Sequence, residues 1–423
     1  MNTVRVLLSV AINFAWPLFQ MDVKNAFLHG DLEEEVYMKL PPGHSQAGDK
    51  DMVCKLHKSI YGLKQSPRVW YAKLSSVLEN VGFRRSNVDS SLFIRIGSTG
   101  KLVVLIYVDD LIVTGDNLPK IHSLKQYLRN KFALKDLGIL KYFLGIELAH
   151  SSKGLFLNQR KYAFDLLQKA EMSACKPTRT PLDTNLKLDI QGEPLTNLSY
   201  YQRMVGKLIY LTITRPDISY AVSIVSQFMH SPTTTHLKIV HRILRYLKGS
   251  IGRGILMKKN NHTTIIGYTD ADWVGNSIDR KSTTGFCTFV GGNLVNWKSK
   301  KQSVVARSSA DAKYRAMAST ACELIWLKGL LGDLGFSHTQ PMSMFCDNQA
   351  AMHIASNHVF HERTKHIEVD CPYVRTQVQS NIIDTHYKRS YDQLADIFTK
   401  SLASIRFQRI LDKLGSINPF DPA

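Results

Sequence analysis

The first 150 residues alternate short apolar runs with polar stretches, a pattern that predicts strands mixed with helices. Two runs rich in Val, Ile and Leu, Leu102–Ile106 and Leu111–Val113, are typical of buried strands. Upstream, the segment FQMDV alternates apolar and polar residues, which predicts a half-buried strand with Asp22 on its polar face. The apolar run Val6–Phe19 is expected to form an amphipathic helix that leads into this strand.

Helical patterns dominate the middle of the chain, and strand patterns return after it. Within the middle part, the Pro- and Asp-rich stretch 176–194 predicts an exposed linker. Further on, TTIIGYTDADW and FCTFVGGNLVNW predict strands, and Ser308–Leu334 predicts a long helix. The expected regions are 1–150, 151–260, 261–405 and a C-terminal tail, 406–423.

Two acidic positions lie at the ends of the predicted strands. Asp109 and Asp110 join the two buried runs, and Asp22 follows the half-buried strand pattern. Adjacent carboxylates are costly to desolvate, so one interpretation is a site for Mg²⁺, which prefers carboxylate oxygens. The other interpretation is an acidic hairpin tip in water. If the strands lie side by side, Asp22 and Asp109 meet and can hold two ions, which favours the metal site.

The chain is strongly basic along its whole length. It contains 54 Lys and Arg residues against 35 Asp and Glu residues, a formal charge of +19. Beside the acidic strand ends, this surplus favours a polyanionic partner, most simply nucleic acid, over a basic protein without such a partner. The six cysteines form no CxxC pair and are expected to be reduced thiols.

No segment is expected to cross a membrane. The run Val6–Phe19 is interrupted by Asn13 and Pro17, is too short to span a bilayer, and lacks the basic start and cleavage site of a signal peptide. The reduced thiols and the lack of a signal peptide predict an intracellular protein that is not secreted. No self-association surface is readable, so the oligomeric state stays open.

Ordered motifs across nearly the whole chain resemble copia-type retrotransposon Pol polyproteins. FQMDVKNAFLHGDLEEEVYMKLPPG, LHKSIYGLKQSPRVWY, LIYVDDLIVTGDN and LKYFLGIEL resemble the palm of that family's reverse transcriptase. KLIYLTITRPDISYAVSIVSQFM and ILRYLKG resemble its connecting region. YTDADWVG, SSADAKYRAMA, CDNQAA, HERTKHIEVD and DQLADIFTKSL resemble its RNase H domain. The implied fold is α+β and multidomain: a right-hand polymerase palm with truncated fingers, a helical thumb or connection region, and an α/β RNase H-like domain.

The resemblance implies a polymerase site at the first acidic positions. Asp22 and Asp109 would bridge two Mg²⁺ ions, or Mn²⁺ in their place, with Asp110 beside them. Phe27 would lie beneath the incoming sugar and select deoxynucleotides, whereas its other interpretation is a plain core aromatic. Residues implied to contact the template, the incoming nucleotide or the primer end are Gly62, Lys64, Gln65, Arg68, Phe143 and Gly145. The implied partners are an RNA template, a DNA primer, an RNA–DNA hybrid and dNTP.

The resemblance also implies a two-metal RNase H site that hydrolyses RNA in a hybrid. Its catalytic and metal-binding carboxylates would be Asp270 on the first strand, Asp347 after a later strand, and Asp396 opening the last helix. Asp272 shares the strand face of Asp270 and is either a supporting residue or a solvated one.

One ligand position of this second site departs from the family. The family has a Glu ligand on the first helix where this chain has Lys313, so a −1 charge becomes +1. The ammonium is expected to pair with Asp270 or Asp347, and hybrid cleavage is expected to be lost. Asp311 stands three residues after Ser308, the spacing of a capping box, and is interpreted as structural. Glu323 lies too far along the helix to replace the missing ligand.

Two further features bear on function. The basic fingers residues that the family has upstream of Asp22 are expected to be missing, which would impair polymerase activity. His358, His361, His366 and Cys371 fit no paired zinc-ligand spacing, so an exposed polar segment is preferred. The resulting hypothesis is a retroelement RNA-directed DNA polymerase with an RNase H domain, impaired in this copy. The alternative is a catalytically decayed or repurposed nucleic-acid-binding protein.

Overall fold

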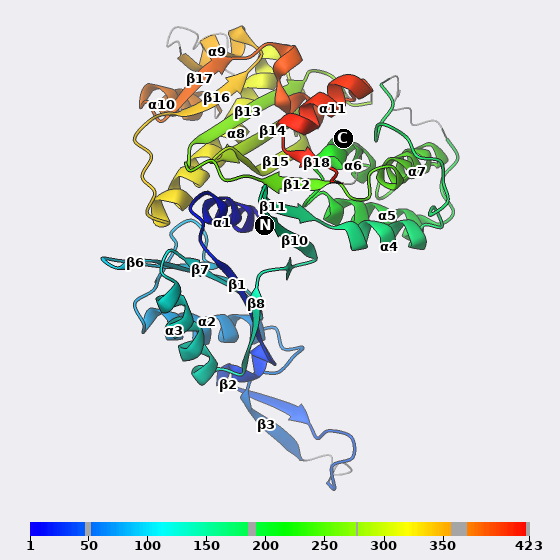
Figure 1. Cartoon of the computed structure of the whole chain (residues 1–423). Coiled ribbons are helices and arrows are strands. Elements are labelled where there is room, and N and C mark those ends of the chain that lie inside the picture. The colour runs from blue at the N-terminus through cyan, green and yellow to red at the C-terminus, as the bar shows by residue number, and fades with distance from the viewer. Residues whose placement is uncertain (47–51, 185–191, 276–277, 357–369, 420–423) are drawn as a thin grey trace. The chain divides into compact units, whose positions relative to one another are not determined.

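The computed structural model describes residues 1–46, 52–184, 192–275, 278–356 and 370–419 (Figure 1). Its contacts divide the chain into two compact units. The β1 unit comprises Ala15–Leu140 with Asp333–Gly335, and the α1 unit comprises Met1–Phe14, Lys141–Gly332 and Phe336–Ala423. This division does not test the predicted domains 1–150, 151–260, 261–405 and 406–423, which stay predictions.

The β1 unit is built on a six-stranded antiparallel sheet in the order β4-β5-β6-β7-β1-β8. Its strands are β1 (Leu18–Val23), β4 (Arg84–Arg85), β5 (Leu92–Gly97), β6 (Gly100–Tyr107), β7 (Asp110–Gly115) and β8 (Leu134–Ile139). Two helices, α2 (Ser66–Glu79) and α3 (Leu118–Lys131), pack on this sheet, where Leu74 and Leu128 join a core with Met21, Val104 and Val113. The predicted apolar strands therefore form and are buried as expected.

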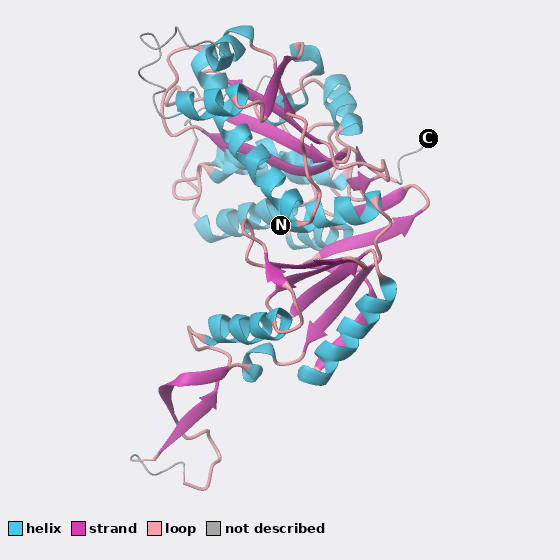
Figure 2. Ribbon diagram, turned by 90° about the vertical axis from the view of Figure 1, so that its left-hand side faces the viewer, coloured by secondary structure: helices cyan, strands magenta, loops and turns pink. Residues whose placement is uncertain are grey.

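A separate two-stranded hairpin extends from the β1 unit (Figure 2). It consists of β2 (Asp31–Lys39) and β3 (Val53–Lys58), which follow a short 3₁₀ turn, η1 (Ala26–His29). Most of its residues are exposed, including the apolar Tyr37, Met38 and Val53, because a two-stranded hairpin has little core of its own in which to bury them.

The α1 unit contains two five-stranded sheets. The first has the order β18-β12-β11-β10-β9, and the second has the order β15-β14-β13-β16-β17. The first sheet comprises β9 (Tyr142–Phe143), β10 (Ile146–Ser151), β11 (Gly154–Asn158), β12 (Gly254–Met257) and β18 (Ser416–Ile417). The helices that follow β11 are α4 (Arg160–Lys169), α5 (Leu198–Leu211), η2 (Pro216–Ile218), α6 (Ser219–Ser226) and α7 (Thr234–Lys248).

The second sheet carries the expected RNase H-like segments. Its strands are β13 (Ile265–Asp272), β14 (Thr283–Val290), β15 (Asn293–Lys301), β16 (Met342–Cys346) and β17 (Ile383–Tyr387). The neighbouring helices are α8 (Ser309–Asp333), α9 (Gln349–Ser356), α10 (Asp370–Gln379), η5 (Ser390–Asp392), η6 (Leu394–Phe398) and α11 (Ser404–Lys413). β13 runs antiparallel to β14 and parallel to β16, so the carboxyl ends of β13 and β16 meet at one edge.

The helix predicted before the Asp22 strand forms as α1 (Asn2–Asn13), but it is not amphipathic in its surroundings. Nearly all of its residues are buried, including polar Ser9 and Asn13. Ser9 Oγ donates to Val290 O at 2.7 Å, and Asn13 Nδ2 donates to Gly291 O at 3.3 Å. The expectation of a polar helix face is therefore wrong, because distant backbone carbonyls accept hydrogen bonds from the buried side chains.

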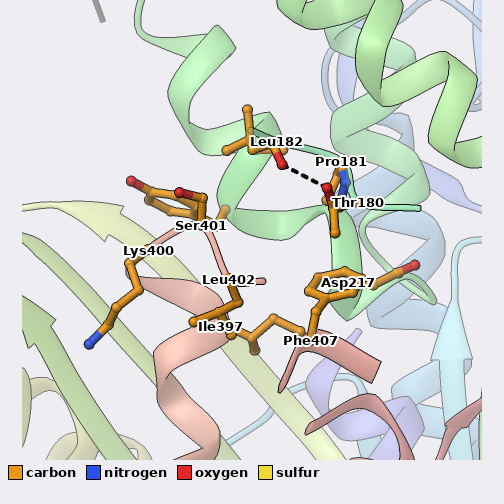
Figure 3. A pocket seen from close by; sticks show the side chains of 11 residues that line it. Thr180, Pro181, Leu182, Asp217, Ile397, Lys400, Ser401, Leu402 and Phe407 are labelled. Carbon is orange, nitrogen blue, oxygen red and sulfur yellow. Dashed lines mark hydrogen bonds between the residues drawn. The ribbon is translucent and has the colours of Figure 1, made fainter. Parts of the chain in front are cut away.

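The predicted exposed linker 176–194 is also partly buried. Pro181 and Leu182 are buried, and they line a small cavity of about 10 Å³ with Leu402 and Phe407. Figure 3 shows Leu182, Leu402 and Phe407 around this cavity, with Lys400 directed away from it. Residues 185–191 lie outside the described part of the chain. The volume is about that of one water molecule, so the cavity serves packing and holds no substrate.

Candidate active sites

The first acidic positions meet at one end of the β1 unit's sheet. β6 and β7 form a hairpin whose turn contains Val108 and Asp109. β1 pairs with β7 so that Asp22 lies opposite Asp110, and the Val23 N–H donates to Asp109 O at 2.8 Å. The prediction that the Asp22 strand and the Asp109 hairpin lie side by side is confirmed.

Two side chains that were not predicted support this end of the sheet. Gln20 Nε2 donates to Asp110 Oδ1 at 3.1 Å, and the buried Trp70 donates its indole N–H to Val108 O at 2.7 Å. Val108 has a φ of 54°, a left-handed conformation that is unfavourable for a β-branched residue. The Trp70 hydrogen bond therefore helps to hold the strained turn that presents Asp109.

The electrostatics of this end favour a cation. Burial raises the pKa of Asp110, the Gln20 hydrogen bond opposes that rise, and the charges of Asp109 and Asp22 add to it. Among the described residues, no Lys, Arg or His forms an ion pair with any of the three carboxylates. Carboxylate oxygens are the ligands that Mg²⁺ prefers, so these residues fit a divalent cation.

The other residues predicted for the polymerase are spread over several elements. Phe27 lies in η1, where it is half-buried against the core and 4.8 Å from the ring of Tyr61. Gln65 and Arg68 line a cavity of about 380 Å³ that also includes Glu33 and Glu34. A half-buried ring fits both interpretations of Phe27, a sugar gate and a plain core aromatic. The role of Phe27 as a sugar gate therefore stays a prediction.

Gly62 and the turn at Gly145 adopt the conformations that only glycine takes easily. Gly62 has a φ of 98°, and Lys64 follows it in the approach to α2. Leu144 and Gly145 form the tight turn between β9, which ends at Phe143, and β10, and Gly145 has a φ of 74°. Phe143 and Gly145 belong to the α1 unit, so their predicted contact with a primer end stays a prediction.

The second acidic site assembles from three segments of the α1 unit. β13 carries Asp270, Asp347 follows β16, and Asp396 lies in η6. One carboxylate oxygen from each residue lies within 4.8 Å of the others. Among the described residues, no other group of three possible metal ligands lies so close together. The carboxylates of Asp22, Asp109 and Asp110 are therefore farther apart than those of this second site. The predicted meeting of the three aspartates is confirmed, although Asp396 lies in a short 3₁₀ helix and does not open α11.

Lys313 from α8 enters this carboxylate group. Its Nζ lies 2.6 Å from Asp270 Oδ1 and also contacts Asp347 Oδ1. Asp270 is fully buried and the side chain of Lys313 is only 13% exposed. The expectation that Lys313 pairs with Asp270 or Asp347 is confirmed, and it pairs with both.

Two further cations, which the sequence did not indicate, contact the same carboxylates. Lys400 Nζ lies 3.3 Å from Asp270 Oδ2 and 3.2 Å from Asp396 Oδ1, and Arg406 contacts Asp396 Oδ2. Thr399 Oγ1 donates to Asp270 Oδ2 at 2.5 Å. A usable signal existed for Lys400, because it stands four residues after Asp396, but Arg406 is brought in by α11.

The charges shift the pKa values in opposite directions. Burial favours the neutral form of Asp270, but Lys400 and Lys313 outweigh it and lower the pKa of Asp270. Burial also opposes the charge on Lys313, but Asp270 and Asp347 raise the pKa of Lys313. Burial and then the Asp270 charge raise the pKa of Asp396 to about 7, against Lys400. The centre is thus neutralised by its own side chains.

This centre does not fit a metal ion between Asp270 and Asp347. A dication 4 Å from an ammonium is repelled by about 8 kcal/mol at an effective dielectric of 20, so Lys313 and the metal compete for one position. Asp272 is half-buried, and burial raises its pKa. Asp272 is therefore not simply solvated, and the charge of Asp270 adds to the rise in its pKa.

The remaining carboxylates on α8 do not compensate. Ser308 Oγ accepts the N–H of Asp311 at 3.1 Å, and Asp311 Oδ2 accepts the N–H of Arg307 at 2.9 Å. The structural interpretation of Asp311 is confirmed. Glu323 accepts a hydrogen bond from Asn2 Nδ2 at 3.4 Å and does not join the cluster.

Two sequence predictions fall elsewhere. His358, His361 and His366 lie outside the described residues, as does the side chain of Cys371. Within the described part of the chain, no helix is long and apolar enough to cross a membrane.

Comparisons with known proteins agree with the motifs. Residues 1–184 match the family described as reverse transcriptase (RNA-dependent DNA polymerase). The retrovirus-related Pol polyprotein from transposon RE1 of Arabidopsis thaliana is 44% identical over 98% of this chain, which spans 28% of that polyprotein. A Ty5-1 transposon protein of Saccharomyces cerevisiae is 34% identical over 72% of this chain and 100% of its own length.

A solved structure was also compared. The foamy viral protease-reverse transcriptase in complex with dsDNA aligns with 88% of this chain and 68% of its own, at 12% identity and a TM-score of 0.21. The family of this chain therefore follows from its sequence relatives alone. By those relatives, the chain belongs to the reverse transcriptase family of copia-type retrotransposon Pol polyproteins.

Proposed function

We propose that this chain copies RNA into DNA at Asp22, Asp109 and Asp110, and that its RNase H-like domain binds RNA–DNA hybrid without cutting it. The register of β1 against β7 carries the first part, because it joins three carboxylates at one sheet end. The two acidic centres differ in one respect that matters. Among the described residues, the first has no paired cation, whereas Lys313 fills the second.

The residues of the first centre have distinct tasks in this proposal. Asp22 and Asp109 hold the divalent ions, and Trp70 fixes the turn through Val108 O so that Asp109 keeps its position. Bound Mg²⁺ supplies the stabilisation of the attacking and leaving oxygens in nucleotidyl transfer. Asp110, whose pKa is raised by burial, keeps negative charge close to that position when it ionises. The substrates would be an RNA template, a DNA primer and dNTP.

Primer extension tests the polymerase part directly. The purified chain is given an RNA template, a labelled DNA primer, dNTP and Mg²⁺, and extended primer is measured. We expect extension that Asp109→Asn abolishes, while Asp165→Asn, a carboxylate change on α4, leaves it intact. Extension that survives Asp109→Asn would contradict the assignment of the site.

A second candidate function is nucleic-acid binding without any catalysis. The cation-filled second centre favours it, because that site has already exchanged a metal position for an internal ion pair. The formal charge of +19 predicts hybrid binding that weakens steeply with salt as counterions are released from phosphates. Salt-dependent binding together with no extension would select this function, whereas binding unaffected by salt would contradict the electrostatic basis of both.

A further inference from the structure

A basic groove lies beside β15 and α8 in the α1 unit. We call it the β15–α8 groove, and its volume is about 570 Å³. The described residues that line it include Lys298, Lys300, Lys301, Arg315, Ser319 and Cys322. This volume is in the range of ligand-sized sites, well above a single water or phosphate position.

The position of β15 explains why this groove is open. β15 is an edge strand of its sheet, so one side has no neighbouring strand. Lys298 and Lys300 are exposed and two residues apart, which puts them on the same strand face about 7 Å from each other. On α8, Arg315, Ser319 and Cys322 have the i, i+4, i+7 spacing of one helix face. The two elements thus face each other with polar side chains between them.

The described lining offers hydrogen-bond donors and positive charge. Carboxylates near it are already engaged: Lys301 Nζ lies 2.7 Å from Asp279, and Arg315 Nε lies 2.9 Å from Asp311. Burial raises the pKa of the partly buried Glu323, and the positive charge of Lys298 opposes this rise. Lys300 has no carboxylate partner among the described residues. The groove therefore keeps unmatched positive charge along the β15 edge.

We propose that the β15–α8 groove binds the sugar–phosphate backbone of nucleic acid, as a contact separate from the acidic centres. The inference rests on the proposed function, which supplies the nucleic acid. Two lysines along one strand address phosphates, and the hydroxyl groups of Ser303 and Ser319 add neutral donors. The groove is distinct from the Lys313 centre, because residues 313 and 315 point to different sides of α8.

Charge reversal in the groove tests this proposal against a matched control. The variants are Lys298→Glu/Lys300→Glu, in the groove, and Lys258→Glu/Lys259→Glu, two exposed lysines after β12 that do not line it. Both change the net charge equally. Binding of a fluorescein-labelled RNA–DNA hybrid is measured by anisotropy at several salt concentrations.

We expect the groove variant to bind at least about tenfold more weakly, with a log–log salt slope shallower by about 2. The control variant should lose less than about threefold affinity and keep its slope. The neutral variant Lys298→Gln/Lys300→Gln should show an intermediate loss. Equal losses in both charge-reversal variants would mean that only net charge matters and would overturn the groove.

The exposed thiol of Cys322 gives an independent readout inside the groove. Bound hybrid should slow alkylation of Cys322 by a maleimide, followed by peptide mass spectrometry, while half-buried Cys175 reacts at an unchanged rate. The protection should vanish in the groove variant. If the unmodified chain binds hybrid without protecting Cys322, the groove proposal is contradicted, whereas the proposed function is not. If the unmodified chain binds no hybrid at all, the proposed function itself is overturned.

Discussion

The Lys313 ammonium lies 2.6 Å from Asp270 Oδ1, in a position between two carboxylates of the RNase H-like centre. Asp270 is fully buried, so its charge has little access to water. Removing one partner of a buried ion pair typically costs about 3–5 kcal/mol, because the other charge stays buried without compensation. Lys313 is therefore both a barrier to metal binding and a part of the folded structure.

Lys313→Met should destabilise the α1 unit at neutral pH by about 3 kcal/mol, because Asp270 and Asp347 lose their shared cation. This is the lower end of the range for a broken buried pair, since Lys400 and Thr399 still contact Asp270. The measurement is the free energy of unfolding in urea, with circular dichroism as the probe. Lys328→Met, on the same helix, is the control. If both variants lost the same stability, the effect would come from the helix and not from the carboxylate contacts.

The same ion pair sets a pH dependence with a definite sign. The pKa of Asp270 is lowered in the folded state, so its stabilisation is present above the unfolded value near 4 and is lost as the pH falls below it. The pKa of Lys313 is raised, so its stabilisation is present below the unfolded value near 10.4 and is lost as the pH rises through the folded value. The stability gap between the native chain and Lys313→Met should thus be widest from about pH 5 to pH 9 and narrow below pH 4. A gap that grows towards pH 3 would contradict this pairing.

Lys313→Glu should restore a metal-binding carboxylate and with it cleavage of the RNA strand of a hybrid. The native chain should leave the hybrid intact with Mg²⁺ or Mn²⁺. At an effective dielectric of 20, the ammonium repels a dication about 4 Å away by about 8 kcal/mol. Labelled RNA in a hybrid, resolved on a denaturing gel, reports the outcome. Recovered cleavage should disappear in Lys313→Glu/Asp347→Asn. If the native chain cleaves the hybrid and Asp347→Asn abolishes that cleavage, Lys313 does not exclude the metal ion.

The sequence predicted most of what is local in these two centres. The apolar runs around Asp109 are buried strands, and the alternation that ends in Asp22 is their neighbour. The charge of Lys313 and its place in the motif were sufficient to predict its pairing. These features could be predicted because each depends on strand periodicity or on one residue type at a known spacing.

What the sequence did not predict depends on contacts between distant segments. Gln20 contacts Asp110 across a strand register, and Trp70 reaches Val108 from a helix. Arg406 reaches the second centre only because α11 folds back towards η6. Polar residues of α1 were expected to face water, but carbonyls nearly 300 residues away accept their hydrogen bonds. Periodicity cannot reveal such partners, since it reports only which side of an element is apolar.

Trp70→Phe should slow primer extension by about tenfold while leaving template binding unchanged. The loss of one hydrogen bond is worth about 0.5–1.5 kcal/mol, and here it frees a turn in which Val108 is already strained. Phe keeps the ring that packs 5.1 Å from Phe132, so the core should survive. Extension rate and template affinity are measured side by side. An equal loss of both would indicate a general structural defect and not a displaced Asp109.

The buried Arg5 links α1 to two other parts of the α1 unit. Its Nη1 donates to Ile213 O at 2.9 Å, and its guanidinium lies 4.0 Å from the centre of the Trp297 ring. Nη2 donates to Asn2 Oδ1 at 2.9 Å within the helix itself. The side chain thus joins the helical region after α5 and the strand β15 through one planar, charged group.

Arg5→Ala should lower the free energy of unfolding of the α1 unit by about 2–4 kcal/mol, because it removes a charge-assisted hydrogen bond and the cation–π contact and leaves Ile213 O without its donor. Arg5→Lys should recover only part of this loss, since an ammonium cannot donate to Ile213 O and cover the Trp297 ring in the same planar geometry. Urea unfolding is measured for both, with the exposed Arg179→Ala as the control, which should change stability by less than about 0.5 kcal/mol. If Arg5→Ala changed the free energy of unfolding as little as Arg179→Ala, the contacts of Arg5 would not contribute to the stability of the α1 unit.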